Sequence, residues 1–228
     1  MLGTIVNAAA ILVGALLGRL LKAGLPEKIR NIILQAIGLV TILIGLQMVL
    51  EVRNVLLVLA SMLAGAITGE LLDLEDNLRK WGETLQRRFS FAGHAGAAFV
   101  QGFVMASLLY CVGAMAVMGS LESGLTGKHT TLFAKSALDG TASIMLSAGF
   151  GLGVAFAALP VFLYQGSITL LAGSLRPLIT EAVLAEMTAT GGLLILGISL
   201  NTLEIKQIKV GNLLPALFYA FLLAHFFS

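Results

Sequence analysis

Long apolar runs constrain the fold of this chain more than any other feature of its sequence. A helix needs about 20 predominantly apolar residues to cross the hydrocarbon core of a bilayer, and the chain contains about eight such runs. Of its 228 residues, 58% are hydrophobic and only 11% are charged. Soluble domains have about 45–50% apolar and about 25% charged residues. The sequence therefore predicts an all-α, polytopic transmembrane bundle that forms one membrane domain over residues 1–228.

Charged residues and turn residues between the runs give the expected helix boundaries. The eight expected helices cover about residues 3–21, 26–50, 54–72, 97–118, 131–150, 154–171, 179–203 and 211–227. The first run has no basic segment before it and ends in Gly18, Arg19 and Lys22. This pattern indicates a retained helix and not a cleaved signal peptide.

Glycine and proline predict breaks in two of these helices. Gly140 directly follows an acidic residue in the fifth helix and favours a break there. Residues 149–153, GFGLG, predict a tight turn or a flexible break. Pro160 removes a backbone hydrogen bond inside the sixth helix, which frees nearby carbonyl groups to bind a ligand.

One stretch has the character of a water-soluble helix. Between residues 71 and 89, apolar side chains recur at spacings of three and four, and the positions between them are charged. This spacing predicts a cytoplasmic amphipathic segment, residues 73–92, that lies on the membrane surface. A surface helix without a function is the simpler interpretation, and docking of a partner is the alternative.

Basic residues indicate the orientation of the chain in the membrane. The connections after the odd-numbered helices hold most of them: Arg19, Lys22, Lys28, Arg30, Arg79, Lys80, Arg87, Arg88, Lys206 and Lys209. The other connections hold Arg53, Lys128 and Arg176, with Lys135 just inside the fifth helix. Cytoplasmic loops are enriched in Lys and Arg. We therefore expect the first set in the cytoplasm and both chain termini outside.

Two segments of the chain resemble each other. Residues 36–54, AIGLVTILIGLQMVLEVRN, and residues 189–207, ATGGLLILGISLNTLEIKQ, share a Leu-Glu-aliphatic-basic ending. The match makes a first unit, residues 1–72, equivalent to a second unit, residues 151–228, with two central helices in residues 93–150. An odd number of spans separates equivalent helices, so the two units have opposite orientations. Such inverted repeats are typical of transporters, although a duplication retained only for folding is the alternative.

The most polar span is the fifth expected helix, which contains the stretch KSALDGTAS. It places Lys135 and Asp139 one helical turn apart. Charges at membrane depth are costly and usually face a bundle interior or a water-filled path. The alternative is a self-neutralising pair at the wet end of a transmembrane helix. The other candidate residues of an ion pathway carry neutral oxygens or amides: Ser136, Thr141, Ser143, Tyr164, Gln165 and Asn201.

Small residues four positions apart predict two helix-packing faces. Gly14 and Gly18 form one face in the first helix, and Gly65 and Gly69 form another in the third. Such pairs let two helices approach closely. Two of these faces exceed what a small bundle needs internally, so we expect a homodimer in the lipid bilayer. Packing within one chain is the alternative.

Residue types that are missing argue against several functions. The net charge of +2 is too small to indicate nucleic-acid binding. Cys111 is the only cysteine, so no disulfide forms within the chain. The sequence has no CxxC or His-rich metal pattern and no P-loop. Nucleophilic catalysis needs a base within reach, and the three histidines lie near helix ends. We therefore expect no enzyme activity, no metal and no cofactor.

Stretches along nearly the whole chain also match a known family. They are GTIVNAAAILVGALLG, GLPEKIR, GELLDLE, FVMASLLYCVGAMAVMGSLESGLTG, KSALDG, LPVFLYQGSITLLA, AEMTATGGLLILGISLN and VGNLLPAL. Through them the chain resembles the bacterial membrane-protein family DUF554, also called the YdfK/YqgA-like family. That family usually has proline where this chain has Ala114, so a helix break there is less strongly expected. The resemblance implies a bacterial inner-membrane protein, for which transport is the usual supposition.

The sequence is compatible with three functions. A transporter or channel for a small ion or solute fits the inverted repeat and Asp139, and a carboxylate among neutral oxygens suits Na⁺ or H⁺. A non-transporting scaffold or regulator of a partner complex would use the amphipathic segment. An intramembrane enzyme would need a base for Cys111 or a second carboxyl, such as Glu186, beside Asp139. Transport is the function that the sequence favours.

Overall fold

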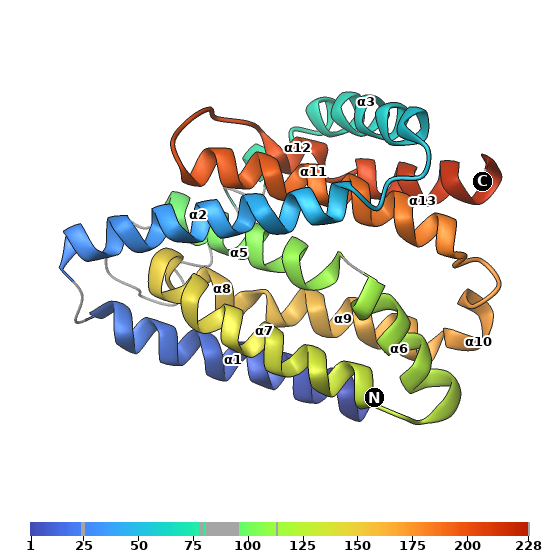
Figure 1. Ribbon diagram of the computed structural model, residues 1–228, viewed down its shortest axis with the longest axis horizontal. Helices are drawn as coiled ribbons and strands as arrows, with labels where there is room; N and C mark the ends of the chain where they lie inside the picture. Colours follow the sequence, from blue (N-terminus) through green and yellow to red (C-terminus); the bar gives the residue numbers. More distant parts are fainter. Residues whose placement is uncertain (24–25, 78–79, 81–95, 113, 228) are drawn as a thin grey trace.

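The chain is a bundle of helices that run mostly along the long axis of the molecule (Figure 1). A computed structural model describes residues 1–23, 26–77, 80, 96–112 and 114–227. The helices are α1 (Leu2–Ala23), α2 (Glu27–Val49), α3 (Val55–Leu71), α5 (Gly96–Cys111), α6 (Ala114–Thr126), α7 (Thr130–Phe150), α8 (Gly153–Phe156), α9 (Ala158–Leu170), α10 (Ala172–Leu175), α11 (Glu181–Thr202), α12 (Val210–Leu213) and α13 (Ala216–Phe227). The predicted all-α class is confirmed for the described residues.

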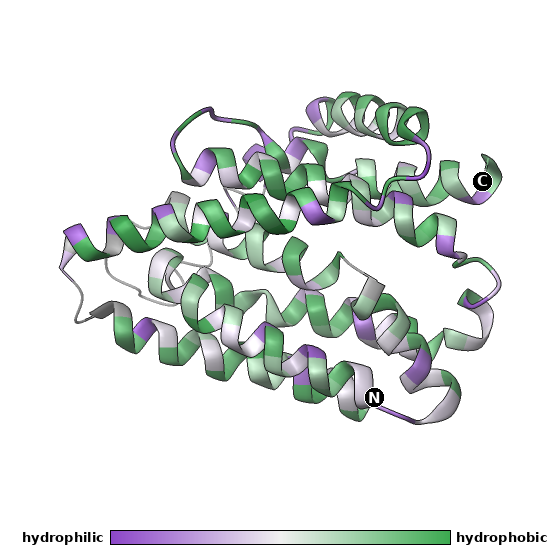
Figure 2. Ribbon diagram, in the orientation of Figure 1, coloured by the Kyte–Doolittle hydropathy of each residue, from purple (hydrophilic) through white to green (hydrophobic). Residues whose placement is uncertain are grey.

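The outside of the bundle is apolar, as a surface in contact with lipid must be. Leu20, Leu39 and Leu163 are 71%, 61% and 56% exposed. Hydrophobic residues dominate the helices, and hydrophilic ones gather at connections such as the loop from α11 to α12 (Figure 2). So large an exposed apolar surface is unfavourable in water and favourable in lipid, so the bundle suits a bilayer.

The described residues contain five stretches long and apolar enough to cross a membrane: Leu2–Leu21, Asn31–Val49, Gly153–Leu170, Glu181–Thr202 and Val210–Phe227. The bent pair α5 and α6 makes a sixth if it is counted as one span. Helix α3 has only 17 residues, and the polar helix α7 lies outside this set. Of the eight expected spans, five or six of the described ones are therefore long and apolar enough to cross a membrane.

The fourth expected helix is wrong as a single straight span. Residues 97–118 were expected to form one helix, but α5 ends at Cys111 and α6 begins at Ala114. The axes of the two arms differ by 56°. Both arms are apolar, so hydropathy gives no sign of the bend.

The predicted break at Gly140 is also wrong, because α7 continues through this residue to Phe150. Gly140 instead lies against Ala10 of α1, so its missing side chain serves close packing. The turn predicted in residues 149–153 is confirmed at Gly151, whose φ is +86°. Between α8 and α9 the helix is interrupted at Ala157. Pro160 then occupies the first turn of α9, where a missing N–H costs little.

The four glycines of the predicted packing faces are all used inside one chain. A Cβ atom on Gly14 would overlap the backbone oxygen of Gly140, and one on Gly18 would overlap that of Ile144. In the same way α3 packs through Gly65 and Gly69 on the backbone of Ala216 and Asn212. The glycines therefore give no separate argument for a dimer, and the homodimer stays a prediction.

Helices α2 and α11 pack on each other in antiparallel directions. A Cβ on Gly45 would meet Leu196 and the backbone of Gly192, whereas one on Gly38 would meet Leu203. Residues nearer the start of α2 thus contact residues nearer the end of α11. The contacts of α3 with α12 and α13 follow the same antiparallel order. Helices α2 and α3 of the first unit therefore lie against the helices that the predicted repeat makes equivalent to them.

Only the beginning of the predicted amphipathic segment, residues 73–92, belongs to the described residues. After α3 the chain turns at Asp73, whose φ is +48°, and residues 74–77 are helical. Glu75 then reaches the start of α12, where its carboxylate accepts a hydrogen bond from the Gly211 N–H at 2.6 Å. Apart from Lys80, the rest of the segment lies outside the described residues.

The connection between α2 and α3 is fixed by a buried carboxylate. Glu186 of α11 is 1% exposed, and its Oε1 accepts hydrogen bonds from the backbone N–H groups of Arg53 at 3.1 Å and Asn54 at 2.7 Å. The Arg53 guanidinium also reaches Glu181 at 3.2 Å. Glu186 therefore holds a connection of the chain and is not a partner of Asp139.

Replacing Glu186 tests this role in stability. Glu186→Leu leaves two backbone donors without an acceptor, so we expect the free energy of unfolding to fall by roughly 1–3 kcal/mol. Glu186→Gln keeps the accepting oxygen and should stay much closer to wild type. The measurement is unfolding of the purified protein in detergent, followed by circular dichroism. Equal stability of the two variants would rule out the anchoring role.

Candidate functional site

Helix α7 holds a buried ion pair whose two residues, Lys135 and Asp139, are one helical turn apart. The Lys135 Nζ donates to Asp139 Oδ1 at 3.0 Å, and the two side chains are only 9% and 7% exposed. Asp139 is nine residues from the start of α7, which places it roughly 14 Å along the helix at 1.5 Å per residue. The sequence places both charges on one helical face, and the structure turns that face inward.

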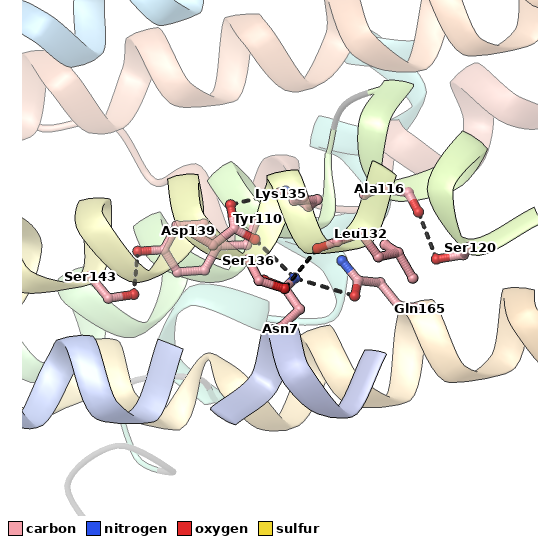
Figure 3. A network of polar contacts seen from close by, with 10 residues as sticks. All are labelled: Asn7, Tyr110, Ala116, Ser120, Leu132, Lys135, Ser136, Asp139, Ser143 and Gln165. Atoms are coloured by element: carbon pink, nitrogen blue, oxygen red, sulfur yellow. Dashed lines mark hydrogen bonds and ion pairs between the residues drawn. The ribbon is translucent and has the colours of Figure 1, made fainter. Parts of the chain in front are cut away.

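Helix α1 completes the surroundings of Asp139 through Asn7. The Asn7 Nδ2 donates to Asp139 Oδ2 at 3.0 Å and to Gln165 Oε1 of α9 at 3.3 Å. Asn7 and Gln165 are both fully buried. In Figure 3 the three side chains point toward one another from three different helices. The network therefore joins α1, α7 and α9 at one point inside the bundle.

Hydroxyl groups extend the polar interior of α7 along its length. The Tyr110 hydroxyl of α5 lies 2.8 Å from Ser143 Oγ, and both residues are buried. Ser136 is also buried and donates to the Leu132 carbonyl at 2.7 Å. These residues surround the ion pair on the same side of α7 (Figure 3). The interior of α7 is thus polar over several turns.

Three fully buried polar atoms of α1 and α9 have no partner among the described residues. They are Asn7 Oδ1, Gln165 Nε2 and Thr4 Oγ1. The orientation of Asn7 follows from chemistry, because the Asp139 carboxylate accepts only and so takes the amide N–H. A buried polar group without a partner costs about 1–3 kcal/mol. The site thus offers one acceptor, one donor and one hydroxyl to a small species.

Three of the candidate residues lie outside this network. Thr141 is exposed and donates to the Ala137 carbonyl of its own helix at 2.8 Å. Asn201 holds the loop after α11, with both its amide oxygen and nitrogen bonded to the Ile208 backbone at 2.7 and 2.8 Å. Tyr164 is half-buried in the wall of a cavity. Lys135, Asp139 and Gln165 share one network, with Ser136 and Ser143 beside it.

Asn7 and Tyr110 are the two network residues that the candidate pathway omitted. Each is a polar side chain in the middle of an otherwise apolar run, which is a sequence signal in itself. Whether such a side chain faces lipid or joins a polar network depends on which helices pack against it. That information comes only from the packing of α1 and α5 on α7.

Two cavities lie along α5 and α11. The larger, about 470 Å³, is almost wholly apolar and reaches from Phe103 past Cys111 to Tyr164 and Met187. The smaller, about 370 Å³, is more polar and includes Gln101, Asn201 and Lys209. Val104 borders both cavities. Together they follow α5 from the end of the bundle that holds the α11–α12 loop to the bend before α6.

The polar mouth of the smaller cavity is charged. The Lys209 Nζ donates to Glu70 Oε1 at 2.7 Å, and this hydrogen bond raises the pKa of the Lys209 ammonium. Asn212 donates to the other oxygen of Glu70 at 2.6 Å. Glu75 and Asp76 line the same cavity. A polar species in water therefore meets fixed charges at this opening.

Apolar helices with lipid-facing leucines around a buried ion pair define a helical membrane protein. The chain belongs to the family described as protein of unknown function (DUF554), whose model matches residues 2–225. It is 34% identical to the uncharacterized membrane protein YdfK of Bacillus subtilis over 221 residues, which are 95% of this chain and 93% of the relative. It is 32% identical to the uncharacterized protein YqgA of Escherichia coli over 96% of this chain and 94% of that protein. No solved structure matches the chain.

Proposed function

We propose that this protein is a membrane transport protein for a small cation, H⁺ or Na⁺, and not an enzyme. The observation that carries the proposal is the buried Lys135–Asp139 pair, held by Asn7 and Gln165 inside an apolar bundle. Replacing a buried ion pair by apolar residues is often neutral or stabilising. Ionisable residues at membrane depth therefore favour a role in ion movement.

The two cavities along α5 support the proposal, because they open a way for a small species into the bundle. The charged opening at Lys209 leads past Val104 to Cys111 and Tyr164. Cys111 in the wall of the larger cavity is next in sequence to Tyr110, whose hydroxyl lies 2.8 Å from Ser143 Oγ of α7. In the proposal, rearrangement of side chains between this cavity and α7 connects the cavity to the pair.

The arrangement of the helices supports an inverted repeat as part of the proposal. The pairs α2–α11 and α3–α13 are antiparallel, and α1 lies against α9 through Asn7 and Gln165. These are the helices that the sequence match makes equivalent. Neighbouring equivalent helices that run in opposite directions are consistent with a two-fold axis in the membrane plane.

An orientation with both termini outside the bacterial inner membrane also belongs to the proposal. Both termini lie at one end of the bundle, whereas the C-terminal end of α1 and the loop from α11 to α12 lie at the other (Figure 1). Arg19, Lys206 and Lys209 sit at this second end. In the proposal it faces the cytoplasm, because basic residues mark cytoplasmic connections. The chain would then cross the membrane eight times, with α5 and α6 as one bent span and with the short helix α3 and the polar helix α7 as two further spans.

Cation flux tests the proposal directly. The purified chain is placed in liposomes, and movement of Na⁺, K⁺ and H⁺ under imposed gradients is compared for wild type and Asp139→Asn. We expect wild type to move cations. In the Asp139→Asn variant the rate of cation movement should fall to that of protein-free liposomes, because an amide has no negative charge to attract a cation. Leu138→Ala is the matched control, since Leu138 is adjacent in sequence but 61% exposed to lipid.

Two results would contradict this function. Wild type without movement of any of the three ions would favour the non-transporting scaffold or regulator. Equal movement by wild type and Asp139→Asn would place the pathway elsewhere in the bundle. Elution of each variant as a single folded species before reconstitution keeps loss of flux distinct from loss of fold.

A further inference from the structure

We infer that the cation carried at this site is H⁺ and not Na⁺, an inference that rests on the proposed function. The first argument is the set of groups around Asp139. Each of its carboxylate oxygens already accepts from a nitrogen, Oδ1 from Lys135 and Oδ2 from Asn7. Hard metal cations in proteins take several oxygen ligands. A metal ion placed at Asp139 would meet an ammonium and an amide N–H, both of which repel it.

The second argument is the space at the ion pair. Counted over the whole residue, Lys135 and Asp139 are 7% and 5% exposed, and neither belongs to the walls of the two cavities along α5. A metal ion that reaches so buried a pair needs room for the ion and for any water that it keeps. A proton needs none, because it adds to an oxygen that is already in place.

The third argument comes from the buried polar atoms without a partner. Gln165 Nε2 donates only, Asn7 Oδ1 accepts only, and Thr4 Oγ1 does both. A metal ion would satisfy the oxygens but not the amide N–H of Gln165. A water molecule both donates and accepts, so water can satisfy each of these atoms, the amide N–H included.

The proton step balances without any further reactant. An entering H⁺ forms an O–H bond on Asp139 and ends its ion pair with Lys135. The Lys135 ammonium then releases a proton on the other side, and the electron pair of the broken N–H bond stays on the nitrogen. Transfer of the proton from the Asp139 carboxyl to the Lys135 amine restores the starting pair. One H⁺ enters and one leaves in each cycle.

Other titratable groups face this pair from the neighbouring helices. Tyr110 and Cys111 come from α5. Tyr164 of α9 lines the same cavity as Cys111. The Tyr110 hydroxyl is already bonded to Ser143. Lys135 is therefore the group in direct contact with Asp139 that exchanges a proton in the cycle.

Liposomes without Na⁺ test the inference. The purified full chain is reconstituted with a pH-sensitive dye inside, and a K⁺ gradient with valinomycin makes the interior negative. We expect wild type and Leu138→Ala to acidify the interior, and Asp139→Asn and Lys135→Gln to match protein-free liposomes. Asp139→Glu keeps a carboxyl group and should retain measurable acidification, which separates loss of the proton site from loss of the fold.

Uptake of radioactive Na⁺ at equal internal and external pH is the companion measurement. We expect no uptake above protein-free liposomes. Na⁺ uptake that depends on Asp139, or acidification that occurs only when Na⁺ is present, would overturn the proton assignment and leave cation transport standing. Movement of neither ion in wild type would overturn both the inference and the proposed function. Acidification by Asp139→Asn at the wild-type rate would overturn the role of the pair.

Discussion

Asp139→Leu should unfold far more readily than wild type, because it leaves the Lys135 ammonium buried without its partner. Removing one member of a buried ion pair costs roughly 3–5 kcal/mol. Lys135 has 9% of its side chain exposed and bonds to Asp139 at 3.0 Å, so little solvent is available to replace the lost carboxylate. The measurement is unfolding of the purified protein by titration of SDS into detergent micelles, followed by circular dichroism.

The double variant Lys135→Met/Asp139→Leu is the control that gives this prediction its meaning. It removes both charges and fills the same space with apolar side chains, so we expect it to recover most of the lost stability. It should nevertheless show no proton movement. Recovery of stability without flux would indicate that the pair is present for ion movement and not for folding.

Two outcomes would contradict this expectation. A loss of less than about 1 kcal/mol in Asp139→Leu would fall in the range of exposed pairs and would mean that water reaches the site. A double variant as unstable as the single one would mean that the Asn7 bond to Asp139 carries the stability. Asn7→Leu in the same background distinguishes this case, because it removes the remaining polar partner.

The positions of the helices were largely predictable from hydropathy. The first expected helix, residues 3–21, corresponds to α1 at Leu2–Ala23, and the seventh, residues 179–203, to α11 at Glu181–Thr202. The bend between α5 and α6 was not predicted, because an apolar run reports that a segment is buried in lipid and not that it is straight. The predicted break at Gly140 was wrong for a different reason. A glycine in a helix signals either a break or a close contact, and only the position of α1 decides between them.

The candidate site was predictable only where its residues share one helix. Lys135 and Asp139 are four residues apart, so helical geometry alone joins them. Asn7 is 132 positions from Asp139 in sequence, and no local rule connects the two. Tyr164 and Asn201 have suitable side chains, but they sit on faces that turn toward a cavity and a loop. Contacts between helices depend on how whole faces pack, which one sequence does not specify.

The contact between α1 and α7 leads to the second prediction in which we expect a large effect. Gly14→Ala should destabilise the protein, because its Cβ would overlap the backbone oxygen of Gly140. Backbone in a packed helix does not move aside as a flexible side chain does, and overpacking typically costs about 1–3 kcal/mol. Gly18→Ala meets the backbone of Ile144 in the same way and should behave alike.

Gly173→Ala is the matched control for this change. A Cβ at Gly173 has no neighbour within 4 Å, and alanine is the better helix former by up to about 1 kcal/mol. The same substitution should therefore destabilise at position 14 and leave stability unchanged or slightly raised at position 173. If Gly14→Ala unfolds at the same SDS fraction as Gly173→Ala, the close approach of α1 and α7 is refuted.

Loss of the α1–α7 contact should also impair ion movement, and for a reason separate from stability. Asn7 lies two turns before Gly14 on α1, and its amide reaches Asp139 at 3.0 Å. A shift of α1 by about 1 Å lengthens that bond beyond the range of a hydrogen bond. Gly14→Ala protein that remains folded in liposomes should therefore move protons more slowly than wild type, whereas Gly173→Ala should match it. A folded Gly14→Ala variant with the wild-type rate would show that Asn7 does not need to hold Asp139 for the ion to pass.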